Sequence, residues 1–195
     1  MATPLMVAAG SGDGASLETM RLLLELGADP LLNLGQASVA RFAAGGLGWN
    51  YPPGGDAPRL RLCLDLGCDP NETDERGVTL LADAAATGDV DRVKVLLHAR
   101  AKPNAAGTVV PTPSFLKFPE SPFDDNAPSS FRIPLHNAVE VNEIVSLLIA
   151  AGGDAQAVDR GRRTALFNAR SSEVARVLVD GAFAERAAGA DSGEV

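Results

Sequence analysis

The sequence predicts an all-α solenoid, in which pairs of short helices stack side by side. One order of signals recurs along the 195 residues: a turn, a short apolar helix, a break, a second apolar helix and the turn again. The apolar segments carry Leu, Val and Ala at helical spacing, and aromatic residues make up only 5% of the chain. Because a single helix pair cannot bury its apolar face, several pairs must stack to form a core.

The stretch from Asp69 to Asn104 shows the repeating unit most regularly. Two apolar segments, Leu80 to Ala86 and Val90 to Leu97, lie between a turn at Asp69-Pro70-Asn71 and its return at Lys102-Pro103-Asn104. This unit resembles an ankyrin repeat, with Leu80 and Ala82 where that repeat has Pro and His. The positions that fit the pattern are Asp74, Gly77, Thr79, Leu81, Ala84, Ala85, Gly88, Val93, Leu96, Leu97 and Asn104.

Five such units are predicted, several of them degenerate. Their approximate bounds are 1–32, 33–73, 74–105, 132–158 and 159–183. The second helix of each unit is expected to end at a turn. These turns begin at Gly27, Gly67, Arg100, Gly152 and Gly181. Thr79 and Thr164 are expected to cap their first helices through the side-chain hydroxyl. Residues 184–195 are rich in Ala, Gly and acidic residues, and we expect them to form a flexible tail.

Two insertions, 45–59 and 105–131, interrupt the regular pattern. The first holds the single Trp and the single Tyr of the chain, Trp49 and Tyr51, among glycines and prolines. The second holds four of the seven phenylalanines: Phe115, Phe118, Phe123 and Phe131. A loop as long as the second is uncommon in a compact array, and is usually functional or disordered. Two roles stay open for its phenylalanines: packing on the side of the stack, or binding a partner.

Charge and composition exclude several classes of protein. The net charge of −8 argues against a nucleic-acid binder and against binding to anionic membranes. No apolar run approaches the ~18 residues of a membrane span. The two cysteines, Cys63 and Cys68, are expected to be small residues in or near the core, in a reducing compartment. We therefore expect a soluble, cytoplasmic protein that is monomeric when free.

The sequence offers little chemistry of its own. No Ser-His-Asp, Cys-His or paired-carboxylate set is recognisable, and the glycines of 45–55 lack the Lys-Ser/Thr of a phosphate loop. We therefore predict no catalytic residue, no cofactor and no metal. The acidic group Glu72, Asp74 and Glu75 is expected at a hairpin tip, either as a solvated turn or as a contact surface for a basic partner.

The resemblance to ankyrin repeats implies a non-catalytic protein that binds other proteins through hairpin tips and first helices. Trp49 and Tyr51 are the best anchors by residue type, because aromatic residues and Arg dominate interface energies. The partner-binding residues expected on this basis are Trp49, Tyr51, Thr73, Glu75, Arg76, Val78, Thr87, Phe115, Phe118, Phe123, Arg160 and Arg163.

Three functional hypotheses follow from these residues. In the first, the array binds and inhibits a partner protein through its concave face and insertions. The most specific form of this hypothesis is a bacterial immunity protein that neutralises a toxin or effector. In the second, it is an adaptor that tethers proteins without inhibiting them. In the third, it is an enzyme with an unrecognised site, in which His136 would be a catalytic base.

Replacing His136 with alanine should destabilise the fold by about 1–3 kcal/mol, because the resemblance implies that this imidazole bonds backbone groups between neighbouring units. Urea unfolding followed by circular dichroism measures the loss. An H136A variant with unchanged stability that lost an enzymatic activity of the wild type would favour the third hypothesis instead.

Overall fold

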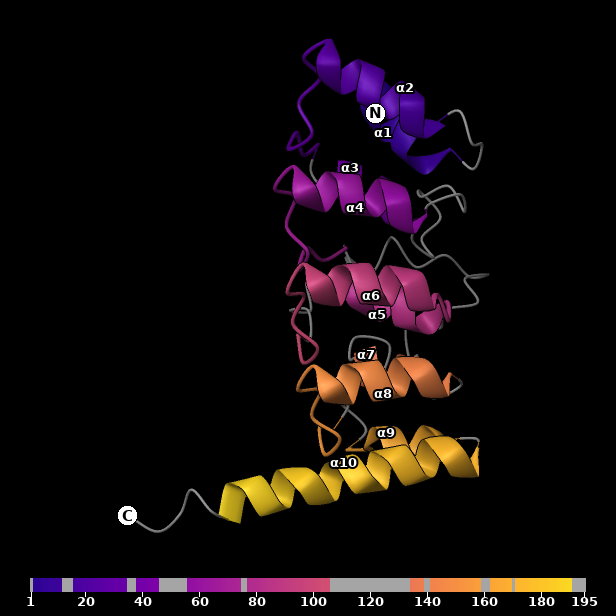
Figure 1. Cartoon of the computed structure of the whole chain (residues 1–195), viewed down its shortest axis with the longest axis vertical. Helices are drawn as coiled ribbons and strands as arrows, with labels where there is room; N and C mark the ends of the chain where they lie inside the picture. The colour runs from indigo at the N-terminus through magenta and orange to yellow at the C-terminus, as the bar shows by residue number, and fades with distance from the viewer. Residues whose placement is uncertain are drawn as a thin grey trace, which may run out of the picture.

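A computed structural model describes residues 2–11, 16–34, 38–45, 56–74, 77–105, 134–138, 141–158, 162–169 and 171–190. The helices form a single column that runs from the N-terminal pair at one end to the C-terminal pair at the other (Figure 1). No strand forms within the described ranges, where Thr73 and Thr79 make an isolated bridge. The predicted all-α solenoid is therefore confirmed.

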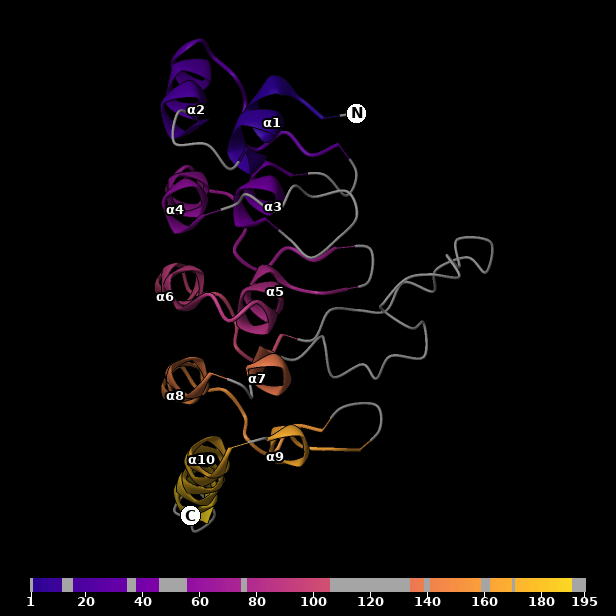
Figure 2. The same cartoon turned by 90° about the vertical axis from the view of Figure 1, so that its right-hand side faces the viewer.

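The helices fall into two layers, which Figure 2 shows as two adjacent columns. We call the layer that holds the first helix of each pair the inner layer, and the layer that holds the second helix the outer layer. The inner helices are α1 (Pro4–Gly10), α3 (Val39–Ala44), α5 (Leu80–Ala86), α7 (Pro134–Asn137) and α9 (Ala165–Asn168). The outer helices are α2 (Ser16–Glu25), α4 (Ala57–Asp65), α6 (Val90–His98), α8 (Asn142–Ala150) and α10 (Ser172–Ala190).

Three of the inner helices, α1, α3 and α5, begin at hydroxyl caps. Thr3, Ser38 and Thr79 accept hydrogen bonds from the backbone N–H three residues later, at 3.2, 2.9 and 3.1 Å. These bonds satisfy N–H groups that have no partner inside the helix. The predicted cap at Thr79 is confirmed. The prediction for Thr164 is wrong: this residue precedes α9 with extended backbone, but its side chain makes no capping bond.

The core lies between the two layers and is continuous from unit to unit. Its large buried side chains are mostly leucines, as the composition predicts, and alanines let the inner helices approach closely. Cys63 lies in this core and Cys68 packs against it, so the predicted placement of both cysteines in or near the core is confirmed. Other members of the core are Leu5, Met20, Leu60, Leu81, Leu96, Leu135, Leu148 and Leu178.

The outer helices α2, α4, α6 and α8 end in the same hydrogen-bonded turn. At each end, a residue with positive φ follows the helix: Gly27 (88°), Gly67 (93°), Arg100 (63°) and Gly152 (87°). The N–H of the next residue then bonds to the carbonyl five positions back, at 2.8–3.1 Å. This is the Schellman arrangement, which returns the chain towards the inner layer. Four of the five predicted closing turns are therefore confirmed.

The fifth predicted turn, at Gly181, is wrong, and so is the flexible tail for residues 184–190. Residues 191–195 lie outside the described part of the chain. Gly181 lies inside α10, which continues to Ala190. It is buried there because α10 crosses α8 closely: a Cβ at this position would lie 2.9 Å from Cδ1 of Ile149. This glycine therefore permits a helix contact and ends no helix. The Ala-rich composition beyond it favours a continued helix.

Two buried arginines tie successive units together. Asp56 and Asp89 cap α4 and α6, accepting bonds from the N–H of Arg59 and Arg92. Each aspartate also pairs with the guanidinium of the same arginine. Burial alone would raise the pKa of Asp89, but the bonds from Arg92 outweigh it and lower that pKa.

The same guanidinium groups reach the previous unit. Arg59 donates to the carbonyls of Ala9 and Ser11, and Arg92 donates to the carbonyls of Ala44 and Gly45. These carbonyls stand at the ends of α1 and α3, where a cation is favoured by the helix dipole. The result is a repeated Asp-x-x-Arg clamp between units one, two and three.

The junction between units three and four is built differently. Val141 precedes α8 without a side-chain cap, and its Cγ2 packs against Gly88. Asn104 links the two closing turns, accepting from the N–H of Asp154 at 2.7 Å and donating to the carbonyl of Gly152 at 2.8 Å. Asn71 accepts in the same way from the N–H of Lys102 at 2.8 Å. The asparagines of the repeating pattern therefore bond consecutive turns.

Replacing Arg100 with glycine should stabilise the protein by up to about 1 kcal/mol, because a non-glycine residue at φ 63° is strained. The matched control is Arg61→Gly in the exposed face of α4, which should cost about 1 kcal/mol. Urea unfolding of the two variants against wild type measures both. A loss of stability in Arg100→Gly as large as that in the control would contradict the assignment of Arg100 to this turn.

Candidate protein-binding surface

Arg41, on the inner helix α3, organises the hairpin that precedes α5. Its side chain is 1% exposed. One terminal nitrogen donates to Oδ2 of Asp83 on α5 at 2.9 Å. The other donates to the carbonyls of Glu72 and Val78, at 3.0 and 3.1 Å. Arg41 stands where the ankyrin pattern has its histidine, so sequence comparison of the units could have found it.

Two of the three acidic residues predicted at the hairpin tip, Glu72 and Asp74, are bonded inside the stack. Glu72 accepts a bond from the hydroxyl of Ser38 at 2.6 Å and lies 3.6 Å from Nε of Arg41. Burial raises the pKa of Glu72, although the bond from Ser38 and the charge of Arg41 oppose that shift. Asp74 is buried and accepts from the N–H of Val78 at 2.8 Å. The expectation of a solvated acidic tip is therefore wrong for Glu72 and Asp74.

Three predicted partner-binding residues of the third unit can be placed. Thr73 is exposed beside the bridge to Thr79. Thr87 is exposed, but its hydroxyl is already engaged: it donates to carbonyls of α5 and accepts from Arg92. Val78 is only 6% exposed, because its carbonyl and N–H bond to Arg41 and Asp74 inside the hairpin. The prediction that Val78 contacts a partner is therefore wrong.

Most of the other predicted contact residues lie outside the described part of the chain. Arg163 alone among them is placed. The predicted residues outside the described ranges are Trp49, Tyr51, Glu75, Arg76, Phe115, Phe118, Phe123 and Arg160.

A cation–π pair with an exposed aromatic ring stands at the inner helix α9. The guanidinium of Arg163 lies over the ring of Phe167, 5.3 Å from its centroid, in a cation–π arrangement. Phe167 is 68% exposed. It occupies on α9 the position that Arg41 holds on α3, which in an inner unit faces the next helix pair. Sequence analysis found Arg163 and missed Phe167, whose signal was an aromatic residue at this repeat position.

A second apolar area follows α2, where the chain crosses towards the second unit. Leu26 is 75% exposed, and Leu31, Leu32 and Leu34 are between 40 and 57% exposed. Leu66, at the end of the neighbouring outer helix α4, is 40% exposed. Single exposed leucines are ordinary, but several in one segment are typical of contact surfaces. We name Leu26, Leu31, Leu32 and Leu34 the leucine loop.

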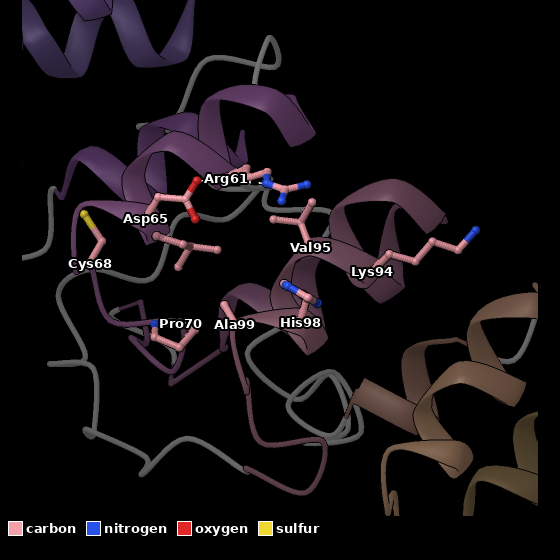
Figure 3. Close-up of a pocket in the computed structure, with 9 residues that line it drawn as sticks. Arg61, Asp65, Cys68, Pro70, Lys94, Val95, His98 and Ala99 are labelled. Carbon is pink, nitrogen blue, oxygen red and sulfur yellow. Dashed lines mark ion pairs between the residues drawn. The ribbon is translucent and has the colours of Figure 1, made fainter.

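The outer layer carries a groove between α4 and α6, with a volume of about 440 Å³ (Figure 3). Charged side chains line its opening, and Cys68 stands at one side of it. The described residues contain no group of three or more His, Cys, Asp or Glu that could hold a metal ion. The lining residues are Arg61, Leu64, Asp65, Cys68, Pro70, Lys94, Val95, His98 and Ala99.

The stacked pairs, the recurring closing turns and the exposed inner-layer edge define an array of helical repeats that serves as a protein-interaction module. The family model of the ankyrin repeat matches residues 2–33. The chain therefore contains an ankyrin repeat at its first helix pair, and the following pairs stack on it in the same two layers. Such arrays are typically non-catalytic and bind other proteins. No curated protein matches this chain. No helix among the described residues is both long and apolar enough to cross a membrane.

The buried pair of Arg41 and Asp83 should show strong coupling in a double-mutant cycle. Arg41→Met alone should cost about 3–5 kcal/mol, because it leaves the Asp83 carboxylate buried without its cation. Adding Asp83→Leu should recover part of that loss, which urea unfolding of the four proteins measures.

The matched control for this cycle is the exposed pair of Arg61 and Asp65, whose nearest charged atoms are 3.9 Å apart. Its coupling should stay within about 0.5 kcal/mol, since water screens both charges. Additive losses in the Arg41–Asp83 cycle would show that this pair does not hold the junction.

Proposed function

We propose that this chain is a scaffold that binds a partner protein along its inner-helix edge and blocks part of that partner's surface. The observation that carries the proposal is the exposed Phe167 with Arg163 stacked on it. Aromatic and Arg side chains are the residues that most often dominate interface energies. Stacking on the ring also orders the guanidinium before a partner arrives, which lowers the entropic cost of binding.

The architecture of the unit junctions supports the same role. Arg41, Arg59 and Arg92 use their guanidinium groups within the stack, so the inner-helix edge is held in place by internal bonds. A rigid support reduces the cost of ordering an interface on binding. Thr73, which is exposed beside the bridge to Thr79, belongs to the same edge in this proposal.

The sharper form of the proposal is an immunity protein that neutralises a bacterial toxin or effector. The net charge of −8 supports a basic partner, because opposite charge speeds association. The free thiols of Cys63 and Cys68 support a reducing compartment, and we place the protein in the cytoplasm, monomeric before it meets its partner. Trp49, Tyr51 and the phenylalanines of 105–131 remain proposed contacts.

Co-expression with the product of the adjacent gene tests the sharper form. An immunity protein should form a stable 1:1 complex with that product and restore growth to cells that express it. A complex that leaves the partner's activity intact would favour a tethering adaptor instead. Absence of a complex together with persistent toxicity would exclude the immunity role.

Replacing Phe167 with alanine should weaken partner binding about tenfold or more, which isothermal calorimetry measures. The matched control is Phe183→Ala on α10, where the side chain is 64% exposed in the outer layer. It should change affinity less than about twofold. Arg163→Ala should resemble Phe167→Ala, since the two side chains act together. A larger effect at Phe183 would place the interface on the outer layer.

A further inference from the structure

The groove between α4 and α6 brings a half-exposed thiol and cationic side chains to one place. Cys68, at the end of α4, lines one side of the groove. Lys94 and His98 come from α6, and Arg61 from α4, so that both outer helices contribute positive or protonatable groups (Figure 3). This groove lies on the outer layer, away from the inner-helix edge proposed for protein binding.

A second thiol stands directly behind Cys68. Cys63 is 0% exposed, and its carbonyl accepts the N–H of Cys68 at 3.1 Å in the closing turn of α4. In such a turn these two positions place their side chains in contact. Each thiol shifts the pKa of the other, and neither is in a disulfide. Cys68 in turn donates to the carbonyl of Pro30 at 3.5 Å.

This arrangement decides which thiol ionises first. The hydrogen bond from Cys63 lowers the pKa of Cys68, although burial and the carboxylates of Glu72 and Asp29 oppose that shift. The same contact and deep burial raise the pKa of Cys63. A thiolate is the reactive form of cysteine, so Cys68 is the nucleophile of the pair and Cys63 is its hydrogen-bond donor.

The charge around the groove differs from that of the whole chain. Arg61 and Lys94 are 64 and 50% exposed at their side chains, and Asp65 is the one carboxylate among the lining residues. Asp65 is 3.9 Å from Arg61, and Lys94 also pairs with Glu143 at 2.7 Å. A molecule with carboxylates beside its reactive sulfur would find cations here, in a protein whose net charge is −8.

We propose that Cys68 is a thiol-modification site for a small anionic disulfide of the oxidised-glutathione class, which enters the groove between α4 and α6. The groove's volume of about 440 Å³ can receive part of such a peptide disulfide. The carboxylates of the bound disulfide lie towards Arg61 and Lys94, and one of its sulfur atoms meets Cys68. The product is a mixed disulfide on the outer layer of the stack.

The reaction is a single thiol–disulfide exchange. Cys68 releases its proton to solvent, and its sulfur attacks one sulfur of the incoming disulfide. The new S–S bond forms as the old one breaks, and the departing thiolate takes the bonding pair and a proton from solvent. Cys68 is oxidised and one half of the disulfide is reduced. Cys63 stays protonated and buried, so it orients and stabilises the Cys68 thiolate without reacting.

The test compares two disulfides of opposite charge, oxidised glutathione and cystamine, on the full chain. Modification rates of the folded protein are divided by those of the urea-unfolded protein, which removes the intrinsic reactivity of each reagent. The normalised rate should be about threefold or more higher for oxidised glutathione. Peptide mass mapping should find the adduct on Cys68 and not on Cys63. An equal or inverted ratio, or an adduct mainly on Cys63, overturns the proposal.

Two sets of variants separate the groove's charge from the thiol pair. Arg61→Glu with Lys94→Glu should remove or invert the preference for the anionic disulfide. The control, Arg176→Glu on the exposed face of α10, should leave it unchanged. If the groove variant keeps the wild-type preference, the assignment of Arg61 and Lys94 is wrong.

Cys63→Ala should slow modification of Cys68 about threefold or more at neutral pH, because the thiolate loses its hydrogen-bond donor. Cys63→Ser, which keeps a donor, should restore most of the rate. Equal rates in both variants and the wild type overturn the role of Cys63. Because these readouts need no binding partner, they fail or succeed independently of the proposed function.

Discussion

The structure depends on the junction between neighbouring helix pairs. A short pair such as α3 with α4 cannot bury its own apolar face, so its stability comes from the pairs above and below it. The junctions between the first three units also bury charge. Arg41, Arg59 and Arg92 each carry a guanidinium into a protein interior, which is unfavourable unless every donor finds an acceptor. Asp56 and Asp89 supply part of the acceptors from within the same unit, but the remaining acceptors are carbonyls and the Asp83 carboxylate of adjacent units. The cost is therefore fully offset only when the units are stacked.

This requirement divides the polar residues into two groups with different roles. Glu72, Asp74 and Asp83 belong to the interior of the stack, because they bond to Arg41 or to the hairpin backbone. Phe167, the aromatic side chain proposed to bind a partner, is exposed because no inner helix among the described residues packs on that face of α9. A face without a neighbouring unit therefore exposes a position that is buried at Arg41 in α3.

The two proposed activities lie on different layers of the stack. The inner-helix edge presents exposed side chains such as Thr73 and Phe167, which suits recognition of a protein surface. The outer layer presents the groove between α4 and α6, where Cys68 is backed by a buried thiol. The closing turn of α4 connects these places, since the chain leaves Cys68 and continues to Glu72 and the hairpin held by Arg41.

The sequence by itself determined the all-α class, the order of the helices and the closing turns at Gly27, Gly67, Arg100 and Gly152. Those features depend on neighbours a few residues apart, and local periodicity and turn residues record them. Only the tertiary structure decided that Val78 and Glu72 are internal, that Gly181 lies within α10 and that Phe167 is exposed. Each of these depends on contacts with another unit or on the lack of one: Arg41 comes from 31 to 37 residues away, and Ile149 lies across a helix crossing. A glycine or a carboxylate has the same local signal in either setting, so its role follows only from what packs against it.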